Sequence, residues 1–152
     1  MEYWNNLDGN EKLNTTKMKK RLFKKEPEII KDYYKNLMAS DFHHFPKKGR
    51  VKVTDNHGVY IIFSPDNEVL HVGNTPSGRN GLNQRLYNHI TKTGVFYRKY
   101  LKKYNISLRG MHKFKYLVVH DVRHRALLEA LTAGSLCPAH FGTGERKKIN
   151  PS

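Results

Sequence analysis

The chain has little of several features that define common protein classes. It has a single cysteine, Cys137, which excludes an internal disulfide and makes a reducing compartment the expected setting. No stretch approaches the roughly 20 consecutive apolar residues of a membrane-spanning helix, and no charged-then-apolar signal segment opens the chain. We therefore expect a protein that is neither secreted nor inserted in a membrane. Its expected location is the cytoplasm, with nucleoid association if it is bacterial.

Carboxylates are also scarce. The 152 residues hold 13 Asp and Glu against 28 Lys and Arg, a formal net charge of +15. No acid occurs between Glu68 and Asp121, although ten Lys or Arg fall in that interval. Solvated surfaces usually mix both signs, so this run favours a surface that faces phosphate. Nucleic acid is the expected partner, ahead of an anionic membrane surface or a charge that serves solubility alone.

The residues that are present suffice for one packed domain, since 38% are hydrophobic and 11% aromatic. Alternating apolar runs at 58–64 and 69–73, joined by a turn, predict a β-hairpin, and residues 113–120 predict a third strand. Helical patterns begin near Gly81, cover 95–104 and follow a cap at Asp121 as far as about Leu136. We expect an α+β fold with a small three-stranded antiparallel sheet flanked by helices.

The first third of the chain has a different pattern. Residues 17–25 predict a basic helix that is a candidate DNA contact, and a second helix from Glu26 to about Ala39 carries an apolar stripe that should dock on the core. Residues 41–55 are expected to be a connecting loop with short strand character at 51–53. We therefore predict a basic N-terminal helical arm at 1–56 and a catalytic domain at 57–152.

Glu129 stands out because acids are so few in this half of the chain. It lies in the helical run Ala-Leu-Leu-Glu-Ala-Leu and is the one acid between Asp121 and Glu145. A phosphodiesterase needs a carboxylate to hold a divalent cation, and Mg²⁺ commonly takes only one or two protein carboxylates. Taken alone, Glu129 is better explained as an exposed residue on the solvent side of an ordinary amphipathic helix.

Five short motifs follow one another along the chain in a fixed order. They are Gly58-Val59-Tyr60, then His71-Val72-Gly73 across the hairpin, then the segment 82–89 with Arg85 and His89, then Glu129, and finally Asn150 in Lys-Lys-Ile-Asn. In this combination the chain resembles the GIY-YIG nuclease family over about residues 58–150. The resemblance implies that fold, a metal-dependent DNA endonuclease activity and Mg²⁺ or Mn²⁺ as cofactor.

The resemblance also implies roles for individual residues. Tyr60 would orient or deprotonate the attacking water, and Arg85 would neutralise the scissile phosphate. Glu129 would bind the metal, Asn150 would brace the site, and His89 would assist proton transfer or contact phosphate. Five further cations are candidate nucleic-acid contacts: Arg79, Arg98, Lys99, Lys102 and Lys103.

Two positions depart from the family pattern. His71 stands where the family has a tyrosine, so either an imidazole takes that role or the position is structural. Asn74 stands where many members have lysine.

Alternatives remain open at this point. A catalytically inactive basic module with the same fold would bind nucleic acid without cutting it. A zinc protein using His120, His124, Cys137 and His140 is a weaker reading, because the paired cysteines typical of zinc sites are missing. Restriction-like and repair- or recombination-like roles are both compatible with the sequence. A homodimer is expected if both DNA strands are cut, because a single domain has one active site.

Overall fold

A computed structural model describes residues 25–142 and 144–145 of the chain. The helices are residues 25–39, α2 Leu82–Ile90, α3 Gly94–Phe96, the π-helical turn η2 Tyr97–Leu101 and α4 Val122–Leu136. The strands are β1 His43–His44, β2 Gly58–Phe63, β3 Val69–Asn74, β4 Lys113–Val118, β5 His140–Phe141 and β6 Gly144–Glu145. The basic helix predicted at 17–25 lies outside the described residues except for its last position.

The main sheet is antiparallel with the strand order β1-β4-β2-β3. The three predicted strands are confirmed, and β1 adds a fourth at the edge, where His43 pairs with Phe114 of β4 and stacks on its ring. The strand character expected at 51–53 is absent. The backbone N–H groups of Val53 and Thr54 instead donate to the Asn83 side chain at the start of α2, which satisfies them without a strand partner.

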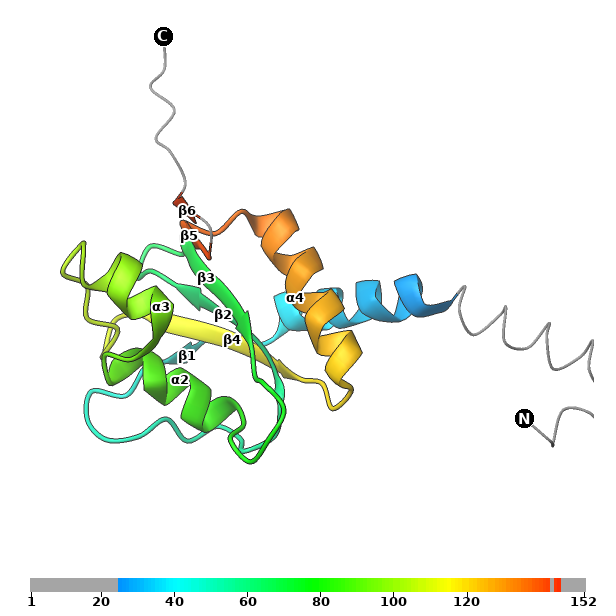
Figure 1. Cartoon of the computed structure of the whole chain (residues 1–152), viewed down its shortest axis with the longest axis horizontal. Coiled ribbons are helices and arrows are strands. Elements are labelled where there is room, and N and C mark those ends of the chain that lie inside the picture. Colours follow the sequence, from blue (N-terminus) through cyan, green and yellow to red (C-terminus); the bar gives the residue numbers. More distant parts are fainter. Residues whose placement is uncertain (1–24, 143, 146–152) are drawn as a thin grey trace, which may run out of the picture.

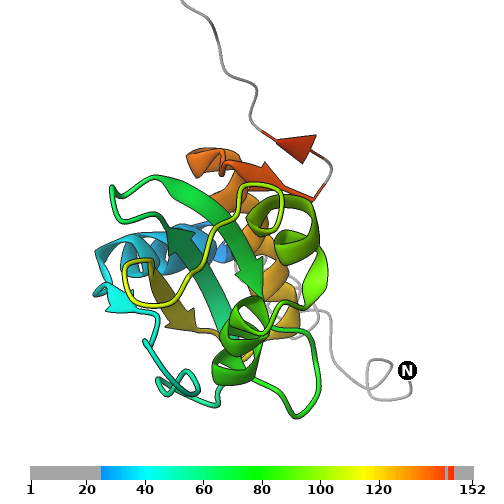
Figure 2. The same ribbon diagram turned by 90° about the vertical axis from the view of Figure 1, so that its left-hand side faces the viewer.

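The sheet has a packed layer on each face, as Figures 1 and 2 show. The alternation of β2 turns Tyr60 and Ile62 toward α2 and α3, and Val59 and Ile61 toward α4 and the helix at 25–39. The latter helix buries Ile30 and Leu37 in the second layer, so the predicted docking of its apolar stripe is confirmed.

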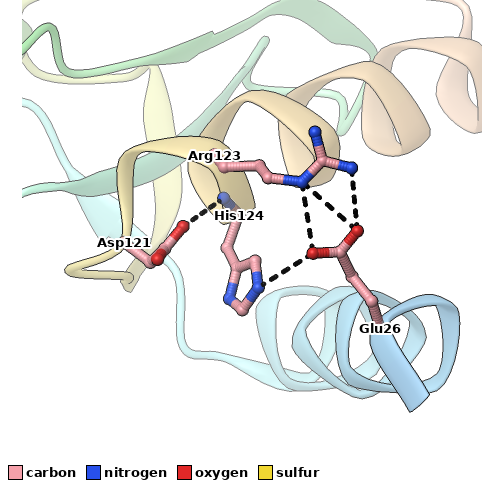
Figure 3. Close-up of polar contacts among 4 residues, drawn as sticks. All are labelled: Glu26, Asp121, Arg123 and His124. Carbon is pink, nitrogen blue, oxygen red and sulfur yellow. Dashed lines mark hydrogen bonds and ion pairs between the residues drawn. The ribbon is translucent and has the colours of Figure 1, made fainter. Parts of the chain in front are cut away.

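Polar contacts join the helix at 25–39 to the start of α4 (Figure 3). The carboxylate of Glu26 accepts hydrogen bonds from the Arg123 guanidinium and pairs with the His124 ring. Asp121 caps α4 as predicted, because its side chain accepts a hydrogen bond from the backbone N–H of His124.

Two further elements differ in detail from the prediction. The helix expected over 95–104 forms as the short α3 followed by η2, and it ends at Leu101. Strands β5 and β6 pair with each other in a segment where we expected no regular element. None of the described helices has the length and apolar character needed to cross a lipid bilayer.

The buried face of α4 should contribute strongly to stability. Leu128 is fully buried in the layer that includes Leu37 and Ile61. We expect Leu128→Ala to lower the free energy of unfolding by about 2–5 kcal/mol, measured by urea denaturation, because it leaves a cavity. Val122→Ala on the same helix is the control, since Val122 is 58% exposed and should change stability by less than about 0.5 kcal/mol. Equal effects of the two substitutions would contradict this packing.

Candidate active site

A cavity of about 300 Å³ opens along the edge strand β3. Its lining residues are His71, Val72, Gly73, Asn74, Pro76, Arg85 and Glu129. Because β3 is the last strand of the sheet, helices on both faces can reach around it. Arg85 comes from α2 on one face and Glu129 from α4 on the other (Figure 1). His71, Arg85 and Glu129, which were predicted from separate motifs, therefore line one cavity.

Tyr60 and His89 lie directly behind this cavity, in the layer between β2 and α2. Tyr60 is fully buried, and its hydroxyl oxygen lies 2.7 Å from His89 Nε2 in a hydrogen bond. Gly73 is paired with Tyr60 in the sheet, and a Cβ at position 73 would collide with the tyrosine hydroxyl. Glycine is thus required at 73 because the phenol passes close over its backbone.

Burial keeps this pair uncharged. It raises the pKa of Tyr60 to about 12, an effect that the nearby Arg85 guanidinium opposes and the Glu129 carboxylate reinforces. It lowers the pKa of His89 to about 3, with Arg85 and His140 adding to the effect. A proton on the phenol is therefore far more stable than one on the imidazole, so the resting pair is neutral.

His71 forms part of a stack of rings beside the cavity. Its ring lies 4.4 Å from that of Phe96 at an interplanar angle of 14°, and the His140 ring lies 5.8 Å away. Burial, chiefly, and the neighbouring His89 and His140 lower the pKa of His71 well below its usual value, so its imidazole is neutral at neutral pH. Sequence reasoning missed the contributions of Phe96 and His140. No local signal reveals them, because they depend on how α3 and β5 pack.

Arg85 is the cation of the cavity. Its Nε atom is buried with no hydrogen-bond partner in the described part of the chain, and within that part the guanidinium forms no ion pair. A guanidinium that lines a cavity without an ion-pair partner there is suited to bind a phosphate group in a bidentate manner.

Glu129 supplies the acidic side of the cavity. The Asn74 side-chain amide donates a hydrogen bond to its Oε2 atom. Burial raises the pKa of Glu129, while the Arg85 guanidinium and the Asn74 hydrogen bond lower it and partly offset that effect. Asn74 was noted only as a departure from the family pattern, and the structure shows that it positions the glutamate.

The residues present fit a hydrated divalent cation. Glu129 lines a cavity with room for water ligands, and Mg²⁺ readily keeps several waters when it has one carboxylate. No group of three or more His, Cys, Asp or Glu that could hold a metal occurs among the described residues. In particular, the alternative zinc ligands His120, His124, Cys137 and His140 form no such group.

The other predicted residues lie away from the cavity or outside the described chain. The five candidate nucleic-acid contacts are all exposed: Arg79, Arg98, Lys99, Lys102 and Lys103. Arg79 lines a separate groove beside α2. Asn150 lies outside the described residues.

The chain matches a known protein family. The family model of the GIY-YIG catalytic domain matches residues 56–132, just over half of the 152 residues. It covers Tyr60, His71, Arg85, His89 and Glu129. No curated protein matches the chain.

The buried histidines predict a pH-dependent stability. His89 binds its proton far less readily in the folded chain than in the unfolded chain, where its pKa is about 6.5. The folded state therefore binds fewer protons than the unfolded state. The stability that neutral His89 contributes is fully present above about pH 6.5 and is lost as the pH falls toward 3. We expect the free energy of unfolding to fall between pH 6.5 and 4, with His89 contributing up to about 1.4 kcal/mol per pH unit.

Urea denaturation across this pH range provides the measurement. His89→Gln, which can still hydrogen-bond to Tyr60, should reduce the slope of stability against pH. Asn88→Ala is the matched control because it removes no titrating group. An unchanged slope in His89→Gln would contradict a neutral, buried His89.

Proposed function

Because the chain belongs to the GIY-YIG nuclease family, we propose that it is a metal-dependent endonuclease that hydrolyses DNA phosphodiester bonds. The observation that carries this proposal is the cavity in which Arg85, Glu129 and His71 converge from three elements. The excess of 28 basic over 13 acidic residues supports a polyanionic substrate.

Arg85 and Glu129 have complementary roles in this proposal. The Arg85 guanidinium binds two oxygens of the scissile phosphate and stabilises the charge that develops on them in the transition state. Glu129, held by the Asn74 amide, provides the carboxylate for Mg²⁺ or Mn²⁺. The bound cation supplies further neutralisation of the phosphate.

His71 is the best-placed acceptor for the proton of the attacking water. It lines the cavity and carries a neutral imidazole, whereas Tyr60 is fully buried behind it and has a pKa of about 12. General-base catalysis requires a deprotonated group within reach of the water, and His71 is a neutral imidazole that lines the cavity. We assign Tyr60 and His89 a positioning role, in which their hydrogen bond holds α2 and its Arg85.

The exposed cations of η2 and of the turn that follows it extend the proposed site toward a DNA backbone. Arg98, Lys99, Lys102 and Lys103 would contact phosphates on one side of the scissile bond. We favour a restriction-like role in the cytoplasm, in which two copies of the chain pair to cut both strands.

Loss of either charged residue of the cavity should abolish cleavage. We expect Arg85→Ala and Glu129→Gln to lower the rate of plasmid cleavage in Mg²⁺ by at least about 10²-fold, because each removes stabilisation of the transition state. Gel analysis of supercoiled plasmid, with a chelator added to one series, measures the effect. Lys35→Ala, an exposed cation on the helix at 25–39, is the control for charge and should cut normally.

The outcomes separate the proposal from its alternative. Binding of Mn²⁺, followed by calorimetry, should be lost in Glu129→Gln and retained in Arg85→Ala. If the parent protein binds DNA with steep salt dependence but does not cut it in the presence of any divalent metal, it is instead the inactive binding module. Cleavage by Glu129→Gln at the parent rate would remove the proposed metal site.

His71 can be tested by chemical rescue. His71→Gln keeps a planar polar side chain beside Phe96 but cannot accept the proton, so its rate of cleavage should fall by about 10²-fold or more. His71→Ala should be slow in the same way and should recover part of its activity when free imidazole is added to the plasmid assay. A purely structural role for His71 predicts no rescue by imidazole, and that result would overturn our assignment.

A further inference from the structure

The solvent face of α2 carries an ordered chain of polar side chains that is separate from the cavity. The Arg50 guanidinium donates to Gln84 Oε1 at 2.7 Å, and Gln84 Nε2 donates to Asn88 Oδ1 at 2.8 Å. The Arg50 guanidinium also lies over the Tyr87 ring, 4.6 Å from its centroid. Arg50, Gln84 and Asn88 are hereafter called the amide chain.

The direction of this chain is set by Arg50. Arginine has only donors, so Gln84 must turn its carbonyl oxygen toward it. The Gln84 amide nitrogen then faces Asn88, which must accept with Oδ1. The Asn88 Nδ2 group is left as the free end, without a partner among the described residues, and it can only donate.

Two members of the amide chain, Arg50 and Gln84, line a groove of about 320 Å³ at the start of α2, and Asn88 lies one helical turn beyond Gln84. Three cations line this groove, Arg50, Lys52 and Arg79, while its one acid, Asp55, accepts a hydrogen bond from the Asn83 side chain. The groove is therefore a positively charged surface.

The groove and the cavity are joined through α2. Arg85 and Asn88 are three residues apart, so they are neighbours on the helix surface. Asn88 lies between Arg85, which faces the cavity, and Gln84, which lines the groove. A duplex whose phosphate is bound by Arg85 would bring its neighbouring bases toward Asn88.

We propose that the groove binds the backbone of the DNA duplex beside the scissile bond and that the amide chain, which runs along α2 from the groove to Asn88, reads a base edge. This inference rests on the endonuclease function proposed above. Arg50 and Lys52 hold the backbone, and the Asn88 amide group donates a hydrogen bond to a base acceptor. In the major groove, guanine O6 and N7, thymine O4 and adenine N7 can accept it, whereas cytosine presents only its amino group and cannot.

Reversing the direction of the amide chain tests this reading. In Gln84→Glu, the carboxylate accepts from both Arg50 and Asn88 Nδ2, so Asn88 turns and presents Oδ1 outward. At one base position, the parent should exclude cytosine, whereas Gln84→Glu should accept cytosine and disfavour guanine and thymine, which offer no donor there, each by about 5- to 150-fold. Gln84→Ala, which breaks the chain, should only weaken the preference.

Selection of bound sequences from a randomised DNA duplex library measures the preference, in proteins that also carry Glu129→Ala to prevent cutting. Sequencing of cleaved ends from the active proteins gives a second readout. Asn36→Asp is the matched control, because it adds the same negative charge on an exposed position of the helix at 25–39. It should leave the sequence preference unchanged.

Each outcome is decisive. A switch in Gln84→Glu that is absent in Asn36→Asp supports the inference. A parent protein that cuts DNA but shows no base preference, or the same preference in Gln84→Glu, overturns the inference and leaves the endonuclease function standing. A parent protein that neither binds nor cuts DNA ends both.

Discussion

The hydrogen bond between Tyr60 and His89 is the constraint on which the rest of the site depends. It joins β2 to α2 within a layer built mainly from apolar side chains, including Ile62, Leu82 and Leu86. An unpaired polar group buried there would cost about 1–3 kcal/mol, so burial favours the contact between the two rings. This pairing fixes the rotation of α2 about its axis. That rotation turns Arg85 into the cavity and leaves Gln84 and Asn88 on the outer face.

The position of β3 at the sheet edge determines which groups can meet. A central strand would separate the side chains of its two faces by the sheet itself. At the edge, His71 lies on the face covered by α2 and α3, while Asn74 reaches Glu129 of α4. The carboxylate and the guanidinium therefore share one cavity although they come from opposite layers.

Local sequence patterns predicted the parts of the molecule that depend on local physics. The alternation of β2, the cap at Asp121 and the apolar stripe of α2 all led to the observed elements. The edge strand β1 and the two strands of the β5–β6 hairpin were missed because each strand has two residues and exists only through its pairing partner. The hydrogen bond from Asn74 to Glu129 and the stacking of Phe96 and His140 on His71 were also missed, because they too form only when separate elements pack together. Motif order brought His71, Arg85 and Glu129 together, but it could not show that Tyr60 is buried behind them.

The burial of the site gives a physical reason for a histidine where the family has a tyrosine. Removal from water disfavours the charged form of either side chain. For a phenol this raises the pKa, as at Tyr60, and holds the proton in place. For an imidazole it lowers the pKa, as at His71, so the ring stays unprotonated but binds a proton weakly. The same burial thus keeps a phenol protonated and an imidazole unprotonated. In the mechanism proposed above, the arrival of a negative phosphate would strengthen His71 as a base by favouring its protonated form.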